Sequence, residues 1–443
     1  MHSPCALGAG QALLAAAAGA LTVAGGAVPV TAAHPSPGAG LSSPPGCVLS
    51  APAASTKGPS SRDQTGLTGD LCDRIYAVNN VSTDGASWTV SVIDPRAMTV
   101  VENIPVRPHP HHIYPVPGRN IAYISYLTSR HLDVLDMVSN SVVAHILTGF
   151  GPRHLEFSPD GRLAYTDDFV GDTVTAIDTA AGRTVGVVRV GRHPNHSVPS
   201  ADGRFLFVAN SGESSVSVID TRVLRVVDTV TVGLDPPARP SRPFDLALSP
   251  DGTQVIVTGA GDSSLSFINA QTRTEVASVP TGSPRTTLPG KDLDPQLNVR
   301  LTPDGSFAWV GNQSDSTWSV VSLAGHRLVA ELPAGLGADI LFQPPAGPAA
   351  GLGIGTARHS GRMAVVDPLH PALLRTVATA AGSHIITFNR DWTLAFVSCR
   401  PGNAVSVIDL RTWTDVRDIP VGVFPDGIVY VWFVLGQAQT HSS

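Results

Sequence analysis

Short runs of alternating apolar and polar residues, separated by polar turns, recur along almost the whole chain after residue 69. The clearest copy reads SSVSVIDTRVLRVVDTVTVG, from Ser214 to Gly233, and it predicts a strand, a turn and a second strand. A short polar residue opens each turn, where its side chain can bind the turn's own amides. Eight such residues occur, namely Asp94, Asp136, Asp178, Asp220, Asn269, Ser322, Asp367 and Asp409.

A second predicted hairpin lies between consecutive copies. It is clearest in HLEFSPDGRLAYT from His154 and in DLALSPDGTQVIV from Asp245, where Pro-Asp-Gly forms a tight turn between two apolar strands. Each repeat of roughly 40 to 53 residues therefore holds four strands, which is the size of a propeller blade. We expect an all-β fold, a β-propeller with eight four-stranded blades, because a closed ring protects the sheet edges.

The two ends of the repeat region complement each other. The segment PDGIVYVW, from Pro425 to Trp432, predicts an inner strand without its three companions. The first unit, from about Asp73 to Val106, predicts three outer strands without an inner one. We therefore expect N- and C-terminal strands to share one blade and to close the ring.

The phrases SPDGRLAYT, FLFVANSGESSVSVID and VVDTVTVG resemble the repeats of YVTN-family β-propellers. The resemblance covers roughly residues 73 to 432. The repeat region is also distantly similar to the haem d1 domain of cytochrome cd1 nitrite reductases. The resemblance implies the fold and little about activity, because propellers host unrelated functions.

Composition and the chain ends add the following expectations. A net charge of -6 with dispersed Lys and Arg argues against nucleic-acid binding.

An Ala-rich run before Thr31-Ala32-Ala33 predicts a signal peptide at residues 1–33, although no Lys or Arg precedes the run. The alternative for this segment is a disordered Ala-rich tail. Residues 34–68 predict a disordered lead-in, 69–434 the propeller and 435–443 a disordered tail. We therefore expect a secreted or extracytoplasmic monomer with no membrane span in the mature chain.

Three cysteines remain after removal of such a signal, so one stays unpaired within the chain. Two pairings are open. Cys72 can pair with Cys47, or it can pair with Cys399 and tie the chain ends together.

Counting back from each inner turn finds one polar residue at the expected start of every inner strand, at spacings of 41 to 53 residues. These eight positions are His111 or His112, His154, His196, Asp245, Asn298, Asp339, His384 and Asp426. Imidazoles and carboxylates that converge from different strands are ligands for copper, zinc or iron. The predicted metal-binding residues are His111, His112, His154, His196, Asp245, Asp339, His384 and Asp426, and a solvated channel mouth is the alternative.

The haem d1 resemblance implies a second kind of ligand. That domain places histidines from adjacent blades above its cofactor, and His154 and His196 resemble such a pair. A haem d1-like tetrapyrrole is therefore an expectation, although the C-x-x-C-H motif of a c-type haem is absent. Arginine side chains near the same channel mouth suit an anionic group of a cofactor. Cys399 can be a ligand there, and a buried inert thiol is the alternative for it. The predicted cofactor-binding residues are Arg153, Arg242, Arg358 and Cys399.

Two classes of function follow from this site. The first is a metal or cofactor protein, an oxidoreductase or a lyase, that acts on a small and anionic partner. The second is a non-enzymatic extracellular propeller that binds a partner through the same face. A metal-assisted lactonase of the kind found on related propellers is a third possibility, but no carboxylate set for it is recognisable beyond the ring itself.

Overall fold

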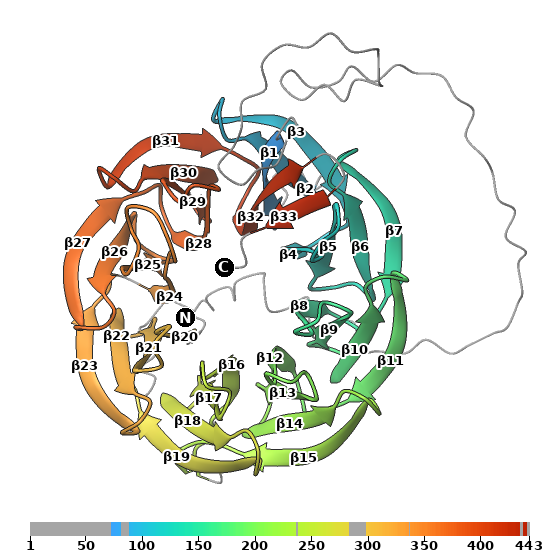
Figure 1. Ribbon diagram of the computed structural model, residues 1–443, viewed down its shortest axis with the longest axis vertical. Helices are drawn as coiled ribbons and strands as arrows, with labels where there is room; N and C mark the ends of the chain where they lie inside the picture. The colour runs from blue at the N-terminus through green and yellow to red at the C-terminus, as the bar shows by residue number, and fades with distance from the viewer. Residues whose placement is uncertain are drawn as a thin grey trace, which may run out of the picture. The chain divides into compact units, whose positions relative to one another are not determined.

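The computed structural model describes residues 72–80, 88–235, 238–282, 298–335, 337–434 and 437–440. The chain divides into two units, residues 1–53 and 54–443, and every described residue belongs to the second. The regular elements of the described residues are all β-strands, in eight sheets arranged as a ring (Figure 1). The predicted all-β, eight-bladed propeller is therefore confirmed. The predicted signal peptide and lead-in lie outside the described residues.

Four sheets, which we call blades 1 to 4, follow each other in the first half of the ring. Their strands, from the inner to the outer strand of each blade, are β4 (Pro110–Pro115), β5 (Ile121–Tyr126), β6 (His131–Asp136) and β7 (Ser141–Leu147); β8 (Pro152–Phe157), β9 (Leu163–Asp168), β10 (Thr173–Asp178) and β11 (Arg183–Arg189); β12 (Pro194–Pro199), β13 (Phe205–Asn210), β14 (Ser215–Asp220) and β15 (Arg225–Thr231); and β16 (Pro243–Leu248), β17 (Gln254–Gly259), β18 (Ser264–Asn269) and β19 (Thr274–Pro280).

Blades 5 to 7 have the same order. Their strands are β20 (Val299–Leu301), β21 (Phe307–Asn312), β22 (Thr317–Ser322) and β23 (Arg327–Pro333); β24 (Ala338–Phe342), β25 (Gly353–Ala357), β26 (Arg362–Asp367) and β27 (Ala372–Ala378); and β28 (Ser383–Phe388), β29 (Leu394–Cys399), β30 (Ala404–Asp409) and β31 (Thr414–Pro420). Blade 8 combines both ends of the chain in β32 (Pro425–Val434), β1 (Cys72–Asn79), β2 (Trp88–Asp94) and β3 (Thr99–Val106).

Each blade follows from its local sequence. The middle strands are mostly buried on both faces, as in β13 and β14, whereas the outer strands alternate between exposed and covered positions, as in β11 and β15. The turn-opening residues act as predicted, because the carboxylate of Asp136 accepts hydrogen bonds from the amides of Val138 and Ser139. Asn269 binds the next turn amides in the same way.

The hydrophobic core lies between the blades rather than within a single centre. Each of the eight interfaces holds its own cluster of buried residues, including the interfaces on both sides of blade 8. Phe207 and Ile268, for example, belong to the cluster between blades 3 and 4. Burial of apolar surface at every joint therefore stabilises the closed ring. None of the described residues forms a helix long and apolar enough to cross a membrane.

Blade 8 confirms the predicted closure by both chain ends. Strand β32 pairs antiparallel with β1, with Ile75 opposite Tyr430. The hydroxyl of Tyr76 then reaches blade 1, where it donates to the carbonyl oxygen of Met137 at 2.9 Å. A further short strand, β33 (Gln437–Thr440), pairs with the other edge of β32, in the segment for which the sequence predicted a disordered tail. The inner strand of the last blade is therefore held from both sides.

Candidate metal centre

The inner strands begin with an unusual backbone that sets the direction of the site residues. In seven blades the residue before the inner strand has a positive φ. These residues are His109, Gly151, His193, Arg242, Gly337, Gly382 and Phe424. The pairing then shifts register over the next residues, for example between Pro110 and Ile113 and between Ser383 and Ile386. Such a bulge turns side chains out of the regular alternation of a strand.

The predicted ring of polar residues lies on this bulge, but it occupies two adjacent positions rather than one. The second residues of their strands are His111, Asp339, His384 and Asp426. The third residues are His112, His154, His196 and Asp245. Asn298 lies directly before β20. The expectation that these residues share a single position at the strand start is therefore corrected, because the bulge adds one position that counting from the turn does not show.

Four histidines from blades 1 to 3 form one cluster, which we call the histidine cluster: His111, His112, His154 and His196. The ring centroids of His111 and His112 are 4.2 Å apart, and that of His154 is 4.9 Å from the first and 5.1 Å from the second. His196 stacks on His154 with 3.7 Å between centroids and 22° between ring planes. One ligand atom each from His111, His112 and His154 lies within 4.8 Å of the other two.

Burial keeps these imidazoles uncharged. It lowers the pKa of His112 to about 3 and that of His196 to about 4, although Asp426 and Asp245 respectively act in the opposite direction. The pKa values of His111 and His154 are also lowered well below their ordinary range by burial and by the neighbouring histidines. The neutral imidazole is the form that binds a metal ion.

Neighbouring groups fix the orientation of two of these rings. Nδ1 of His111 is 3.2 Å from the carbonyl oxygen of Arg153, which can only accept, so this nitrogen carries the proton and Nε2 has the free lone pair. The hydroxyl of Tyr114 lies 3.4 Å from Nδ1 of His154. His112 packs against Gly427 of β32, where a Cβ would lie 2.9 Å from its Nδ1.

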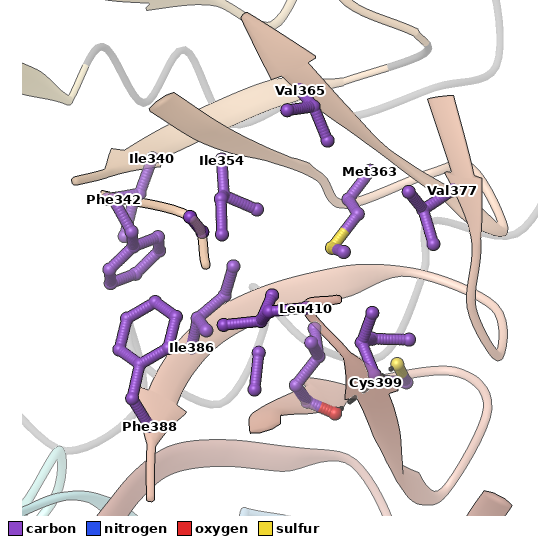
Figure 2. Close-up of a cluster of buried hydrophobic side chains, with 14 residues drawn as sticks. Ile340, Phe342, Ile354, Met363, Val365, Val377, Ile386, Phe388, Cys399 and Leu410 are labelled. Atoms are coloured by element: carbon purple, nitrogen blue, oxygen red, sulfur yellow. Dashed lines mark hydrogen bonds between the residues drawn. The ribbon is translucent and has the colours of Figure 1, made fainter. Parts of the chain in front are cut away.

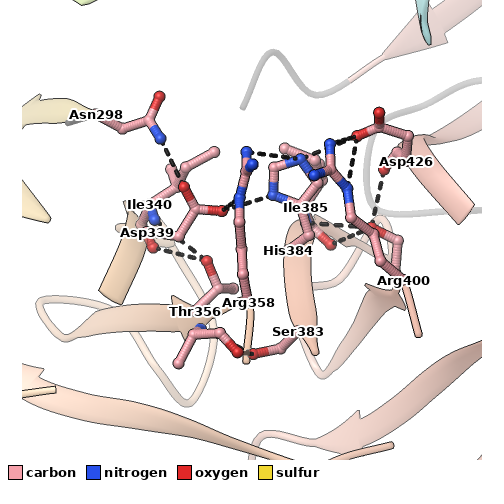
Figure 3. A network of polar contacts seen from close by, with 12 residues as sticks. Asn298, Asp339, Ile340, Thr356, Arg358, Ser383, His384, Ile385, Arg400 and Asp426 are labelled. Carbon is pink, nitrogen blue, oxygen red and sulfur yellow. Dashed lines mark hydrogen bonds and ion pairs between the residues drawn. The ribbon is translucent and has the colours of Figure 1, made fainter. Parts of the chain in front are cut away.

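The carboxylate of Asp426 connects the histidine cluster to a second group of buried charges. Its Oδ2 lies 3.7 Å from Nε2 of His111, and its Oδ1 lies 3.0 Å from Nε2 of His384. Nδ1 of His384 is in turn 2.6 Å from Oδ2 of Asp339. Figure 3 shows His384 between the two carboxylates. The second half of the predicted ring is therefore a chain of direct contacts that runs Asp339, His384, Asp426, His111.

Two arginines balance the charges of these carboxylates. Nε of Arg358 donates to Asp339 at 2.6 Å, and the guanidinium of Arg400 contacts Asp426 (Figure 3). Burial alone would raise the pKa of Asp339, but Arg358 and His384 lower it below its ordinary value, and Arg400 and His111 do the same for Asp426. Burial and both arginines lower the pKa of His384. Two carboxylates and two guanidiniums thus neutralise each other around this imidazole.

On the other side of the histidine cluster, Asp245 has a similar arrangement. Its Oδ1 lies 3.7 Å from Nδ1 of His196, and its Oδ2 accepts a hydrogen bond from Nη1 of Arg300 at 3.0 Å. The histidine cluster is therefore flanked by two buried carboxylates, each paired with an arginine of a neighbouring blade. Carboxylates next to metal-binding histidines commonly orient their rings.

The four predicted cofactor-binding residues are not brought together. Arg153 lies beside the histidines with its guanidinium over the rings of Phe169 and Phe244, 5.2 and 5.8 Å from their centroids. Arg358 is paired with Asp339, and Arg242 is exposed. Cys399 is a free thiol in the hydrophobic cluster between blades 6 and 7 (Figure 2), where burial raises its pKa to about 11. These surroundings are those of a buried inert thiol, which was the alternative to a ligand role for Cys399.

Polar residues at the ends of several second strands make structural contacts rather than contacts to the site. Asn210 and Asn312 end their second strands and donate to hydroxyls of the third strand, as Asn210 does to Ser217 at 2.9 Å. Asp168 accepts the equivalent bonds from threonines. The residues that reach the site directly follow the last residue of a second strand. They are Asn80, Gln313, Arg358 and Arg400.

Sequence reasoning missed Tyr114, Gly427, Arg300 and Glu156. Burial raises the pKa of Glu156 to about 7, with a further contribution from Asp245 that Arg300 partly offsets. One signal could have found Arg300, because it is a charged residue within an inner strand, VRL, that is otherwise apolar. Gly427 follows Asp426 at the position where other inner strands carry His or Asp, which is a second usable signal.

Comparisons with known proteins agree with this fold. A family model described as lactonase, 7-bladed beta-propeller, matches residues 77–274, a segment that includes the whole histidine cluster, whereas the structure has eight blades. No curated protein matches the chain. The solved structure of dihydro-haem d1 dehydrogenase NirN in complex with DHE is similar with a TM-score of 0.60 and 16% identity, over 80% of this chain and 74% of that chain.

Hydrazine synthase from Kuenenia stuttgartiensis is similar with a TM-score of 0.48 and 16% identity, over 66% of this chain and 95% of that chain. The repeats, the eight blades and the likeness to NirN together identify the chain as a β-propeller repeat protein that is distantly similar in fold to a haem d1 dehydrogenase.

Proposed function

We propose that the chain binds one transition-metal ion through the imidazoles of His111, His112 and His154. The observation that carries this proposal is the approach of three ligand atoms to within 4.8 Å of one another. Zinc–nitrogen bonds of about 2.0–2.1 Å put the ligand atoms of a tetrahedral ion about 3.3 Å apart. Small side-chain rotations therefore suffice to close the three imidazoles onto an ion.

The protonation and the surroundings of the cluster support the same proposal. All three imidazoles are neutral near pH 7, so an ion need not displace protons from them. The proton of His111 lies on Nδ1, which leaves Nε2 as the ligand atom beside the carboxylate of Asp426. That carboxylate supplies negative charge next to the cation.

The residues fit a bare ion better than a tetrapyrrole. A haem d1-like cofactor needs cationic groups for its carboxylates, yet both Nε and Nη2 are already engaged in Arg358, by Asp339 and His384, and in Arg400, by Asp426. Arg242 is exposed, and Cys399 belongs to the hydrophobic core. Of the predicted cofactor set, Arg153 lies beside the histidine cluster, and Arg358 contacts His384 instead. We therefore propose copper, zinc or iron as the ligand of this site.

A bound ion of this kind supplies Lewis-acid or one-electron chemistry. The chain itself supplies the hydroxyl of Tyr114, 3.4 Å from Nδ1 of His154, and the cation of Arg153 above the same cluster. A cation beside the metal favours a small anionic substrate. The function that fits these groups is an oxidoreductase or a lyase.

Metal content of the purified protein tests this proposal. We expect one metal ion per chain by inductively coupled plasma mass spectrometry after expression with copper, zinc and iron available. The triple change of His111, His112 and His154 to Gln should abolish binding, whereas His370→Ala should retain it, because that side chain is 87% exposed outside the cluster. A wild-type protein without stoichiometric metal would overturn the proposal.

Lactone hydrolysis is a second candidate activity, because the matched family is described as a lactonase and the match includes the histidine cluster. A metal ion can polarise an ester carbonyl. The three grouped ligands are all imidazoles, however, and the flanking carboxylates of Asp245 and Asp426 are paired with arginines. Metal-dependent opening of a panel of lactones would support this activity, and inactivity of the metal-loaded protein on the whole panel would remove it.

A non-enzymatic binding propeller is the alternative class. The fully paired network of Asp339, His384 and Asp426 favours it, since such a network can serve folding alone. Partner binding that survives the double change of His154 and His196 to Ala would support this class. Loss of bound metal with folding preserved would instead support the metal site.

We also propose that the protein acts outside the cytoplasm. The Ala-rich segment before Ala33 supports export, although it has no basic start. Sequencing of the N-terminus of the secreted protein should find a start near His34. A protein that stays in the cytoplasm with its first residues intact would overturn this part of the proposal.

A further inference from the structure

A cavity of about 230 Å³ lies between blades 5, 6 and 7, at the opposite ends of the inner strands from the histidine cluster. Its walls come from the last residues of β20, β24 and β28 and from the turns that follow them. The residues that matter for its chemistry are Arg300, Phe342, Thr387, Phe388 and Trp392. None of them belongs to the predicted site.

One wall of the cavity comes from a blade that departs from the repeat. Blades 2 to 5 join their first two strands with a short turn such as Ser158–Gly161, whereas blade 6 uses residues 343–352. This longer segment contributes Pro345 to the wall. Its Gly347 has a φ of 77° and packs on blade 7 so closely that a Cβ would lie 2.6 Å from the carbonyl oxygen of Trp392. The added segment is therefore held in place against the cavity.

Aromatic rings form one side of the cavity. Figure 2 shows the rings of Phe342 and Phe388 next to each other at the edge of the hydrophobic cluster. The centroids of Phe388 and Trp392 are 5.2 Å apart, with 37° between their planes. Flat aromatic walls favour a planar apolar ligand, because stacked and tilted rings make close contact.

Arg300 is the charged residue among those that line the cavity. Nη1 of Arg300 donates to Asp245 at 3.0 Å and to the carbonyl oxygen of Val299 at 2.7 Å. Its Nε and Nη2 have no hydrogen-bond partner among the described residues, and the side chain is 38% exposed. Arginine binds a carboxylate through two parallel N–H groups, and this edge of Arg300 offers such a pair.

We propose that this cavity binds a small planar aromatic molecule that carries a carboxylate. Its ring lies against Phe342, Phe388 and Trp392, and its carboxylate accepts hydrogen bonds from Nε and Nη2 of Arg300. The volume is below the roughly 300–1,000 Å³ of pockets for drug-sized ligands, so a single ring fits. Arg300 connects this cavity to the surroundings of the proposed metal site, because its Nη1 pairs with Asp245, which lies 3.7 Å from His196.

Isothermal titration with benzoate, and with benzyl alcohol as its neutral analogue, tests the proposal on protein freed of metal with EDTA. Metal-free protein keeps the result independent of the proposed metal function. We expect benzoate to bind at least about tenfold more tightly than benzyl alcohol, because only benzoate forms charge-assisted hydrogen bonds. Arg300→Gln should remove that difference.

Two controls keep the test decisive. Arg411→Gln removes an arginine that is 60% exposed elsewhere and should leave benzoate binding unchanged. Trp392→Leu should weaken both ligands alike, and it replaces the Arg300 variant if the latter does not fold. Equal binding of benzoate and benzyl alcohol, or no benzoate binding at millimolar concentration, would overturn the proposal.

Discussion

Gly427 packs so tightly against His112 that a Cβ at position 427 would lie 2.9 Å from Nδ1 of that imidazole and 2.8 Å from its Cα. The last inner strand of the chain therefore determines where a histidine of the first blade can lie. Any side chain at position 427 must move His112 or its backbone.

The first prediction concerns this contact. Gly427→Val should displace His112 and weaken metal binding at least about tenfold, because one of three ligands leaves its place. Titration with zinc or copper measures the affinity. Gly325→Val is the matched control, since a Cβ at this exposed turn would approach only side-chain atoms, those of Ser322 at 3.2 Å and Arg327 at 3.4 Å. Unchanged affinity of the Gly427 variant would show that His112 is not a ligand.

The second prediction concerns the pH dependence of stability through Glu156. Its folded-state pKa is raised to about 7 from an ordinary 4.5, so the folded protein holds a proton that the unfolded chain releases. The contribution of Glu156 to the free energy of unfolding is therefore fully present below about pH 4.5 and is lost as the pH rises through 7. Glu156→Gln should therefore stabilise the protein by about 2–3 kcal/mol at pH 8 and have little effect at pH 4.

Urea unfolding at pH 4, 6 and 8 would measure this difference. The comparison of variant with wild type matters, because the histidines have lowered pKa values and change stability in the opposite direction over the same range. A variant that is equally stable relative to wild type at all three pH values would show that Glu156 ionises without penalty.

The third prediction tests the buried charges around His384. Arg400→Gln leaves the carboxylate of Asp426 without its guanidinium partner in a fully buried site. We expect a loss of about 3 kcal/mol in the free energy of unfolding, as for other broken buried ion pairs. The exposed pair of Arg411 and Asp409 provides the control, where Arg411→Gln should change stability by less than about 0.5 kcal/mol. Similar effects of both changes would contradict the network.

The fourth prediction concerns Cys399. Its thiol is fully buried and its pKa is raised to about 11, so the reactive thiolate is scarce at neutral pH. In the native protein at pH 8, iodoacetamide should leave the peptide that contains Cys399 unmodified, and it should modify this peptide after unfolding. Mass spectrometry of that peptide separates it from the other cysteines. Rapid native labelling would place the thiol outside the core.

The blades could be predicted because their signals are local. Period-two apolar patterns and the acidic residues at turns such as Asp136 and Asp178 fix each hairpin without reference to distant contacts. The mixed blade was predictable for the same reason, since Pro425–Trp432 lacks companions in the sequence. The strand β33 carries no such pattern in the four residues QAQT and was not predicted.

The site could be predicted only in part. Counting residues back from a turn assumes a regular strand, and the bulge at Pro110 or Ser383 breaks that rule, so His111 and His112 could not be ranked. Cys399 is the last residue of its strand and reaches the core, whereas Arg358 is the first residue after its strand and reaches a carboxylate. Only the three-dimensional register separates them.

The shared blade also determines when the protein can become functional. Asp426 and Gly427, which support His111 and His112, belong to β32, which a ribosome adds after strands β1 to β31. Until then the apolar clusters on both sides of blade 8 lack the residues that β32 supplies. Ring closure and the support of His111 and His112 by β32 therefore follow the synthesis of the other seven blades, and a chain that is cut short before β32 has neither.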